Sequence, residues 1–335
     1  MKVKKKGMLA TGMVVAASIL ALAGCSSSGT TATPTDDGTA ASGTLTVWVD
    51  ADRARALEDV AKTFEQEKGV KVNLVVKDYG KIRDEFTAQV PTGKGPDITI
   101  GGHDWIGAFV KDGIVAPVEL GDKSADFEKV AVEAVTYDGK TYGLPYAIEN
   151  IAILRNTALG DTGTKVLNLN LSGDLAKEAF NAGKSPYFLT GPWNVADAQK
   201  AGIDVSVDAI PSAGGQTAQP FAGVQAFFLS AKSNNALIAN EFLVNYIATA
   251  DVQTKLFEAG GRPPALTESF KAAQSDPIVA GFAAVGQNAV PMPSIPEMGS
   301  VWDDWGKTEA ALIKGSSDPA GDWVKMADSI QAKLG

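Results

Sequence analysis

From residue 44 onward, the hydrophobic pattern alternates between short apolar runs and amphipathic stretches. Apolar or alternating runs predict strands, and apolar residues spaced three and four apart predict helices. The expected strands cover 45–49, 70–76, 96–100 (stopped by Gly101-Gly102), 187–190 and 224–229. The expected helices cover 57–64, 104–113, 175–181, 192–201, 235–248, 251–259, 300–313 and 319–334. This alternation predicts an α/β fold with a mostly parallel sheet covered on both faces, and so many elements require two lobes.

The N-terminal segment has the features of a bacterial export signal. Lysines at positions 2, 4, 5 and 6 precede an apolar run, Met8–Leu22. That run is shorter than the roughly 20 residues that a membrane-spanning helix needs. It ends in Leu22-Ala23-Gly24-Cys25, which resembles a lipobox, so we expect residues 1–25 to be a signal peptide with lipid attached to Cys25. Residues 26–43 are rich in Ser, Thr, Gly and Ala, which predicts a flexible tether.

Composition narrows the chemistry that the chain can carry. The net charge of −9 argues against nucleic acid as a partner. Cys25 is the only cysteine and His103 the only histidine, so no intramolecular disulfide, His-rich zinc site or cysteine nucleophile is expected. The sequence predicts no cofactor and no metal. Carboxylate pairs remain, because a glycosidase needs only two acids.

Several stretches together resemble the maltose- and maltodextrin-binding proteins of bacterial ABC importers. They occur in the family's order over nearly the whole folded region. The stretches are 46–53, 95–98, 102–104, 142–149, 179–184, 191–193 and 291–298, followed by Trp302. One departure is large: between Thr157 and Asp174 the family has several tens of additional residues.

The resemblance implies a non-enzymatic, two-lobed periplasmic-binding-protein fold of the class II type, whose hinge closes on sugar. Lobe I would comprise 44–148 and 224–272, and lobe II, apparently truncated, 149–223 and 273–335. The partners implied are a malto-oligosaccharide and the ABC permease subunits with their cytoplasmic ATPase. The expected protein is a monomer held at the outer face of the cell membrane by lipid on Cys25.

The residues expected to bind sugar are acids and a base for the hydroxyls and aromatic rings for the C–H face. By resemblance, these residues are Asp52, Arg53, Asp104, Trp105, Glu149, Trp193 and Trp302.

Several of these assignments have a plainer alternative. Asp52 could instead cap a helix, Glu149 could be a surface carboxylate, and Trp105 could serve packing. His103 is expected to be structural. Trp48, Trp305 and Trp323 are interpreted as core residues. Gly306 stands where the family has an arginine, which removes one polar contact.

Three other functions remain open. The solute could be another oligosaccharide, or the shortened second lobe could leave a paralogue with impaired binding. A secreted glycosidase using Asp104 and Glu149 is the remote alternative.

Overall fold

The computed structural model describes residues 43–159, 173–212 and 215–334. The predicted signal peptide, most of the tether and Cys25 lie outside these ranges. The main sheet has seven strands in the order β12-β11-β3-β1-β2, and β4 and β7 also pair with β11. Its strands are β1 (Thr44–Val49), β2 (Lys71–Val76), β3 (Ile98–Gly102), β4 (Val115–Ala116), β7 (Gly143–Asn150), β11 (Phe221–Ser230) and β12 (Val290–Pro291).

Two smaller sheets complete the strand inventory of the described residues. A three-stranded sheet has the order β10-β8-β9, and β5 and β6 form a short hairpin. These strands are β8 (Ala152–Asn156), β9 (Tyr187–Thr190), β10 (Val205–Asp208), β5 (Thr136–Tyr137) and β6 (Lys140–Thr141). The expectation of a mostly parallel sheet was wrong. The pairs β1·β2, β1·β3 and β11·β12 are parallel, but β11 runs antiparallel to β3, β4 and β7.

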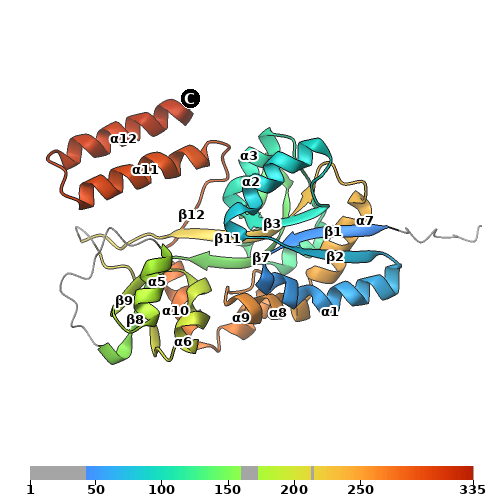
Figure 1. Cartoon of the computed structure of the whole chain (residues 1–335), viewed down its shortest axis with the longest axis horizontal. Coiled ribbons are helices and arrows are strands. Elements are labelled where there is room, and N and C mark those ends of the chain that lie inside the picture. Colours follow the sequence, from blue (N-terminus) through green and yellow to red (C-terminus); the bar gives the residue numbers. More distant parts are fainter. Residues whose placement is uncertain (1–42, 160–172, 213–214, 335) are drawn as a thin grey trace, which may run out of the picture. The chain divides into compact units, whose positions relative to one another are not determined.

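Helices cover both faces of the main sheet, with α2 and α3 on one face and α1 and α8 on the other (Figure 1). The first seven helices are α1 (Ala51–Lys68), α2 (Tyr79–Gln89), α3 (Ile106–Lys111), α4 (Lys129–Ala134), α5 (Gly173–Asn181), α6 (Val195–Lys200) and α7 (Ala236–Glu241). The others are α8 (Ala250–Gly260), α9 (Thr267–Ala273), α10 (Pro277–Gly286), α11 (Met298–Ile313) and α12 (Pro319–Leu334).

Helix α1 shows how local sequence sets the boundaries. Asp50 caps it by accepting a hydrogen bond from the Arg53 backbone N–H at 3.0 Å. Leu57 and Phe64 bury its apolar face. Gly69 ends it in the left-handed conformation at φ 68°, which glycine adopts without steric cost.

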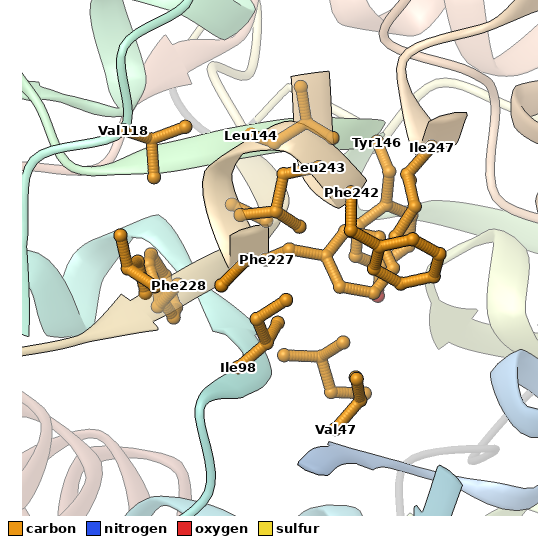
Figure 2. Close-up of a cluster of buried hydrophobic side chains, with 14 of the residues drawn as sticks. Val47, Ile98, Val118, Leu144, Tyr146, Phe227, Phe228, Phe242, Leu243 and Ile247 are labelled. Atoms are coloured by element: carbon orange, nitrogen blue, oxygen red, sulfur yellow. The ribbon is translucent and has the colours of Figure 1, made fainter. Parts of the chain in front are cut away.

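Two separate apolar cores hold these elements. The larger contains residues from 45–147 and 224–266, including phenylalanines of β11 and of the π-helix Phe242–Ile247 that follows α7 (Figure 2). The smaller packs Phe180, Phe188 and Phe282 against β8 and α6. Trp48 is only 5% exposed and belongs to the larger core, as the sequence predicted.

Helices α11 and α12 belong to neither core. They pack on each other, and Lys333 and Ser329 of α12 both bond the Asp304 carboxylate of α11. Among the residues of these two helices, only Met298 and Met326 are buried.

The prediction that Trp323 is a core residue was wrong, since it is 47% exposed. Trp305, also predicted as core, is only partly buried and packs edge-on against Trp323. Among the described residues, no helix has both the length and the apolar character needed to cross a membrane.

Candidate functional site

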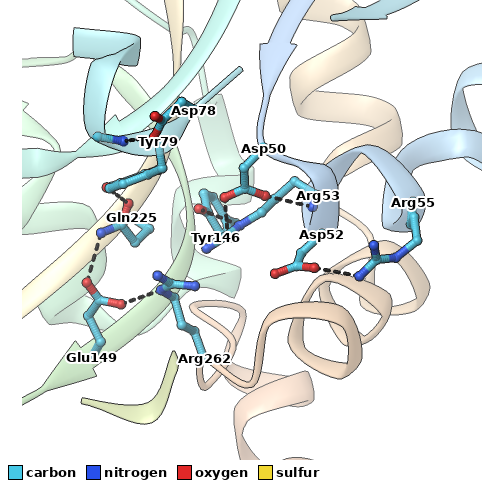
Figure 3. Close-up of polar contacts among 11 residues, drawn as sticks. Asp50, Asp52, Arg53, Arg55, Asp78, Tyr79, Tyr146, Glu149, Gln225 and Arg262 are labelled. Carbon is cyan, nitrogen blue, oxygen red and sulfur yellow. Dashed lines mark hydrogen bonds and ion pairs between the residues drawn. The ribbon is translucent and has the colours of Figure 1, made fainter. Parts of the chain in front are cut away.

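Arg53 lies in the first turn of α1, where β1 ends, and its side chain is buried (Figure 3). Its Nη1 pairs with the Asp50 carboxylate, and its Nε donates to the Tyr146 hydroxyl at 3.1 Å. Its Nη2 has no hydrogen-bond partner among the described residues. Burial opposes the charged form of Arg53, but Tyr146 and Asp50 outweigh it, so the pKa of the guanidinium is raised.

Asp52 points away from this group. Its side chain is 47% exposed and pairs with the exposed Arg55 on the same helix (Figure 3). The alternative that Asp52 caps the helix was wrong, because Asp50 accepts the capping bond. Asp52 therefore stays a predicted sugar contact for which the structure shows only a surface ion pair.

A chain of hydrogen bonds links Tyr79 to Arg262 (Figure 3). The Tyr79 hydroxyl donates to Gln225 Oε1 at 2.6 Å, and Gln225 Nε2 donates to Glu149 Oε1 at 2.8 Å. Arg262 Nε then pairs with Glu149 Oε2 at 2.7 Å, both side chains being 12% exposed. We call Tyr79, Gln225, Glu149 and Arg262 the polar relay.

Two tyrosines of this region stay protonated. Burial raises the pKa of Tyr79, and the neighbouring Tyr146 and Glu149 raise it further. Burial likewise raises the pKa of Tyr146 against the opposing effect of Arg53. Both hydroxyls are therefore neutral groups that can donate hydrogen bonds at neutral pH.

His103 is structural, as expected. It lies in a short turn after β3, is 1% exposed, and its Nδ1 accepts the Val224 backbone N–H at 3.0 Å. This fixes the proton on Nε2, which lies 2.9 Å from the Met292 carbonyl oxygen and donates to it. His103 thus joins β3 to β11 and to the segment that leads into α11.

Asp104 follows His103 and is partly buried. Burial raises the pKa of its carboxyl, while His103 and Arg83 act in the opposite direction. The Trp302 side chain lies close enough to Asp104 to lower the pKa of its carboxyl. Trp302 is 41% exposed and packs edge-on against Phe221 at 5.6 Å between ring centroids. Two of the predicted sugar contacts therefore meet here.

Trp105 fills the space above Gly101. A Cβ on Gly101 would lie 2.2 Å from Trp105 Cζ3, so only glycine fits. The ring also faces Tyr79 at 5.8 Å and Phe109 at 6.0 Å between centroids. The strand prediction that stopped at residue 100 was wrong, because β3 continues through Gly101-Gly102 by pairing with β11.

Trp193 follows β9 in a short turn and is partly exposed. A Cβ on Gly191 would lie 2.0 Å from its Cζ3, 2.3 Å from its Cη2 and 2.6 Å from its Cε3, which places Gly191 against one face of the ring. The Arg262 guanidinium carbon lies 5.5 Å from the ring centroid. Arg262 therefore connects Glu149 of β7 to Trp193.

Gln225, Tyr79 and Arg262 were not among the residues predicted from the sequence. Gln225 is the single polar residue within Val224–Leu229. A buried polar side chain in a strand indicates a specific hydrogen-bonding role. Arg262 stands between Gly260-Gly261 and Pro263-Pro264, a pattern that indicates a fixed loop. Within the described ranges, no three His, Cys, Asp or Glu side chains gather as a metal site.

Comparison with known proteins places this geometry in context. A family model described as "Bacterial extracellular solute-binding protein" matches residues 59–168 and 158–281. The maltotriose-binding protein of Pyrococcus abyssi is 24% identical over 74% of this chain and 72% of its own length. A maltooligosaccharide ABC transporter solute-binding lipoprotein of Streptococcus pneumoniae is 24% identical over 98% of both chains. The galactooligosaccharide-binding protein of Bacillus subtilis is 23% identical over 100% of this chain and 98% of its own.

Two solved structures share the fold. The Thermus thermophilus maltotriose-binding protein bound to maltotriose has a TM-score of 0.75 and 26% identity, covering 87% of this chain and 100% of that one. A cyclo/maltodextrin-binding protein in complex with maltotetraose has a TM-score of 0.74 and 25% identity, covering 87% of this chain and 97% of that one.

Proposed function

Because the chain belongs to the family of bacterial extracellular solute-binding proteins, we propose that it binds a malto-oligosaccharide and delivers it to the permease of an ABC importer. The named relatives and the two sugar-bound structural neighbours support this solute class. The protein would act as a binding component and catalyse no reaction.

The observation that carries the proposal is the junction of Glu149 and Trp193 through Arg262. A sugar needs hydrogen-bond partners for its hydroxyls and an aromatic ring for its C–H face. Glu149 and Gln225 supply the first, and Trp193 supplies the second. We assign these three residues as the centre of the sugar site.

Asp104, Trp105 and Trp302 would extend the site. Trp105 packs against Tyr79 of the polar relay, and Trp302 lies near Asp104. Arg53 would act mainly by fixing Tyr146, since its guanidinium is buried. Asp52 would contact sugar only if the ligand reached the exposed side of α1.

The shortened second lobe is the main challenge to binding. The two family matches overlap at residues 158–168, the region in which the family's additional residues are expected to be missing. In keeping with a missing stretch, the alignment to the galactooligosaccharide-binding protein runs over 428 positions, more than the 335 residues of this chain. The exposed Trp302, Trp323 and Val324 show that α11 and α12 bury little apolar surface. A binding-impaired paralogue is therefore the second candidate function.

Isothermal titration with maltotriose, using the chain from Ser26 without lipid, tests the proposal. We expect a dissociation constant in the micromolar range or tighter, as is usual for specific ligand sites. Trp193→Ala should weaken binding strongly, whereas Trp48→Phe, a conservative change in the main core, should leave it unchanged. Binding heat with a galacto-oligosaccharide, but none with maltotriose, would assign the chain a different solute and keep its role as a binding protein. If the protein folds cooperatively but shows no binding heat with any sugar of a panel, the proposal is refuted.

The same samples separate binding from hydrolysis. A glycosidase acting through Asp104 and Glu149 would release new reducing ends from maltotriose over hours. The binding proposal predicts that the trisaccharide is recovered intact after incubation. Glu149 is already held by Arg262 and Gln225, which favours a role as a hydrogen-bond acceptor.

The cellular setting is proposed from the same relatives, one of which is a lipoprotein. Lipid on Cys25 would hold a monomer at the outer face of the membrane. Globomycin-sensitive processing of the full chain, abolished by Cys25→Ser, would support the anchor. Release of the unchanged chain into the medium would contradict it.

A further inference from the structure

Two groups of the protein itself, the Gly191 backbone and the Arg262 side chain, lie against the Trp193 ring. The Gly191 backbone lies against one face, as the three short Cβ distances to the six-membered ring indicate. The Arg262 guanidinium lies over the ring with its central carbon 5.5 Å from the centroid. The guanidinium therefore stands between this ring and Glu149, where a sugar that used both residues would have to lie.

The Arg262 position is built into the loop that carries it. Gly261 adopts φ 67°, which favours glycine, and a Cβ there would lie 3.2 Å from the Pro192 carbonyl oxygen. This segment therefore approaches the turn of Trp193 closely along the backbone as well as through the side chain. The Glu149 ion pair, with both side chains 12% exposed, holds the guanidinium in place.

Arg262 thus occupies two partners that a sugar needs. Its Nε donates a hydrogen bond to Glu149 Oε2 at 2.7 Å, and its guanidinium forms a cation–π contact with the Trp193 ring. A guanidinium and a pyranose cannot both lie on one face of the same ring.

We propose that Arg262 is an internal competitor that sets the sugar affinity of this chain, so that a sugar must displace it from Trp193 and Glu149. This inference rests on the proposed function and assigns an affinity-setting role to a residue outside the predicted contacts. A cation–π contact of this kind corresponds to about a three- to thirty-fold change in affinity.

Titration of maltotriose into the wild-type chain, Arg262→Ala and Arg262→Gln tests the inference. Both variants should bind about three- to thirty-fold more tightly, because they uncover the ring and free Glu149. Arg155→Ala is the matched control, since Arg155 forms a similar Nε–carboxylate pair with Asp208 at 2.6 Å. It lies opposite Tyr187, at the other end of β9 from Trp193, and should leave the affinity unchanged.

The possible outcomes distinguish failure of this inference from failure of the proposed sugar-binding function. Weaker or equal binding by both variants, with a wild type that binds, would overturn the inference and leave the function intact, because Arg262 would then be a sugar contact or a bystander. Binding by the variants with a silent wild type would support the inference most strongly. Silence from all folded samples would overturn both. If Arg262→Ala fails to fold, Arg262→Gln still tests the inference, provided that it melts cooperatively.

Discussion

Replacing Gly101 by alanine should destabilise the protein through the Trp105 ring. The added Cβ would lie 2.2 Å from Trp105 Cζ3, 2.3 Å from its Cε3 and 3.0 Å from Phe228 Cε2. Carbon atoms in contact prefer about 3.5–4.0 Å, so the ring must retreat by more than about 1 Å. Tyr79 and Phe109 stand beside the ring, which limits its retreat.

Overpacking of this kind costs about 1–3 kcal/mol. The lower unfolded-state entropy of alanine returns about 0.4–1 kcal/mol only where the native site accepts it without strain. Because the Trp105 ring strains this site, we expect a loss of about 1–3 kcal/mol in the free energy of unfolding. Urea unfolding followed by circular dichroism measures this loss. Gly306→Ala is the control: no atom lies within 4 Å of its Cβ position in α11, and it should be neutral or slightly stabilising.

A double-mutant cycle tests the cause. If the clash with Trp105 produces the loss, Gly101→Ala should cost much less in a Trp105→Ala background, because the ring is gone. Additive losses in the cycle would refute the reasoning, and so would a stable Gly101→Ala single variant.

Three further predictions follow from other contacts. Asp97→Ala should lower the free energy of unfolding, measured in urea, by about 3 kcal/mol. The reason is that the Asp97 carboxylate accepts hydrogen bonds from Thr46 N at 2.8 Å, Ser233 Oγ at 2.6 Å and Asn235 Nδ2 at 3.2 Å. An unchanged unfolding midpoint would contradict this prediction. Burial raises the pKa of Asp104, so its contribution to stability is fully present below the ordinary carboxyl pKa of about 3.9 and is lost as the pH rises through the raised value. Asp104→Asn should remove this pH dependence of stability, measured by urea unfolding at a series of pH values. An unchanged pH profile in the variant would contradict this prediction. Trp302→Ala should weaken maltotriose binding by about tenfold in titrations with little loss of stability, because the ring is 41% exposed; unchanged affinity would remove Trp302 from the site.

The sequence predicted the elements whose signals are local. Leu57 and Phe64 recur at helical spacing, and Gly69 closes the helix as glycine does elsewhere. The boundary of β3 was missed because its last residues are glycines whose pairing depends on β11, more than a hundred residues away. The direction of β11 was missed for the same reason.

The candidate site divides in the same way. Trp193 and Glu149 were found through the family resemblance, and the structure joins them through a residue that the resemblance did not supply. Arg262 lies in a loop whose glycines and prolines predict a turn but give no indication of what the turn approaches. Trp323 was assigned to the core from its apolar neighbours, yet α12 packs on α11 outside both cores, a placement that no local pattern encodes.

The most direct test of the account is a crystal structure of the chain from Ser26 with maltotriose. The account predicts a glucosyl ring stacked on Trp193 in place of the Arg262 guanidinium, with hydroxyls bonded to Glu149 and Gln225. Sugar density away from Trp193, or Arg262 still covering the ring in an occupied complex, would contradict it.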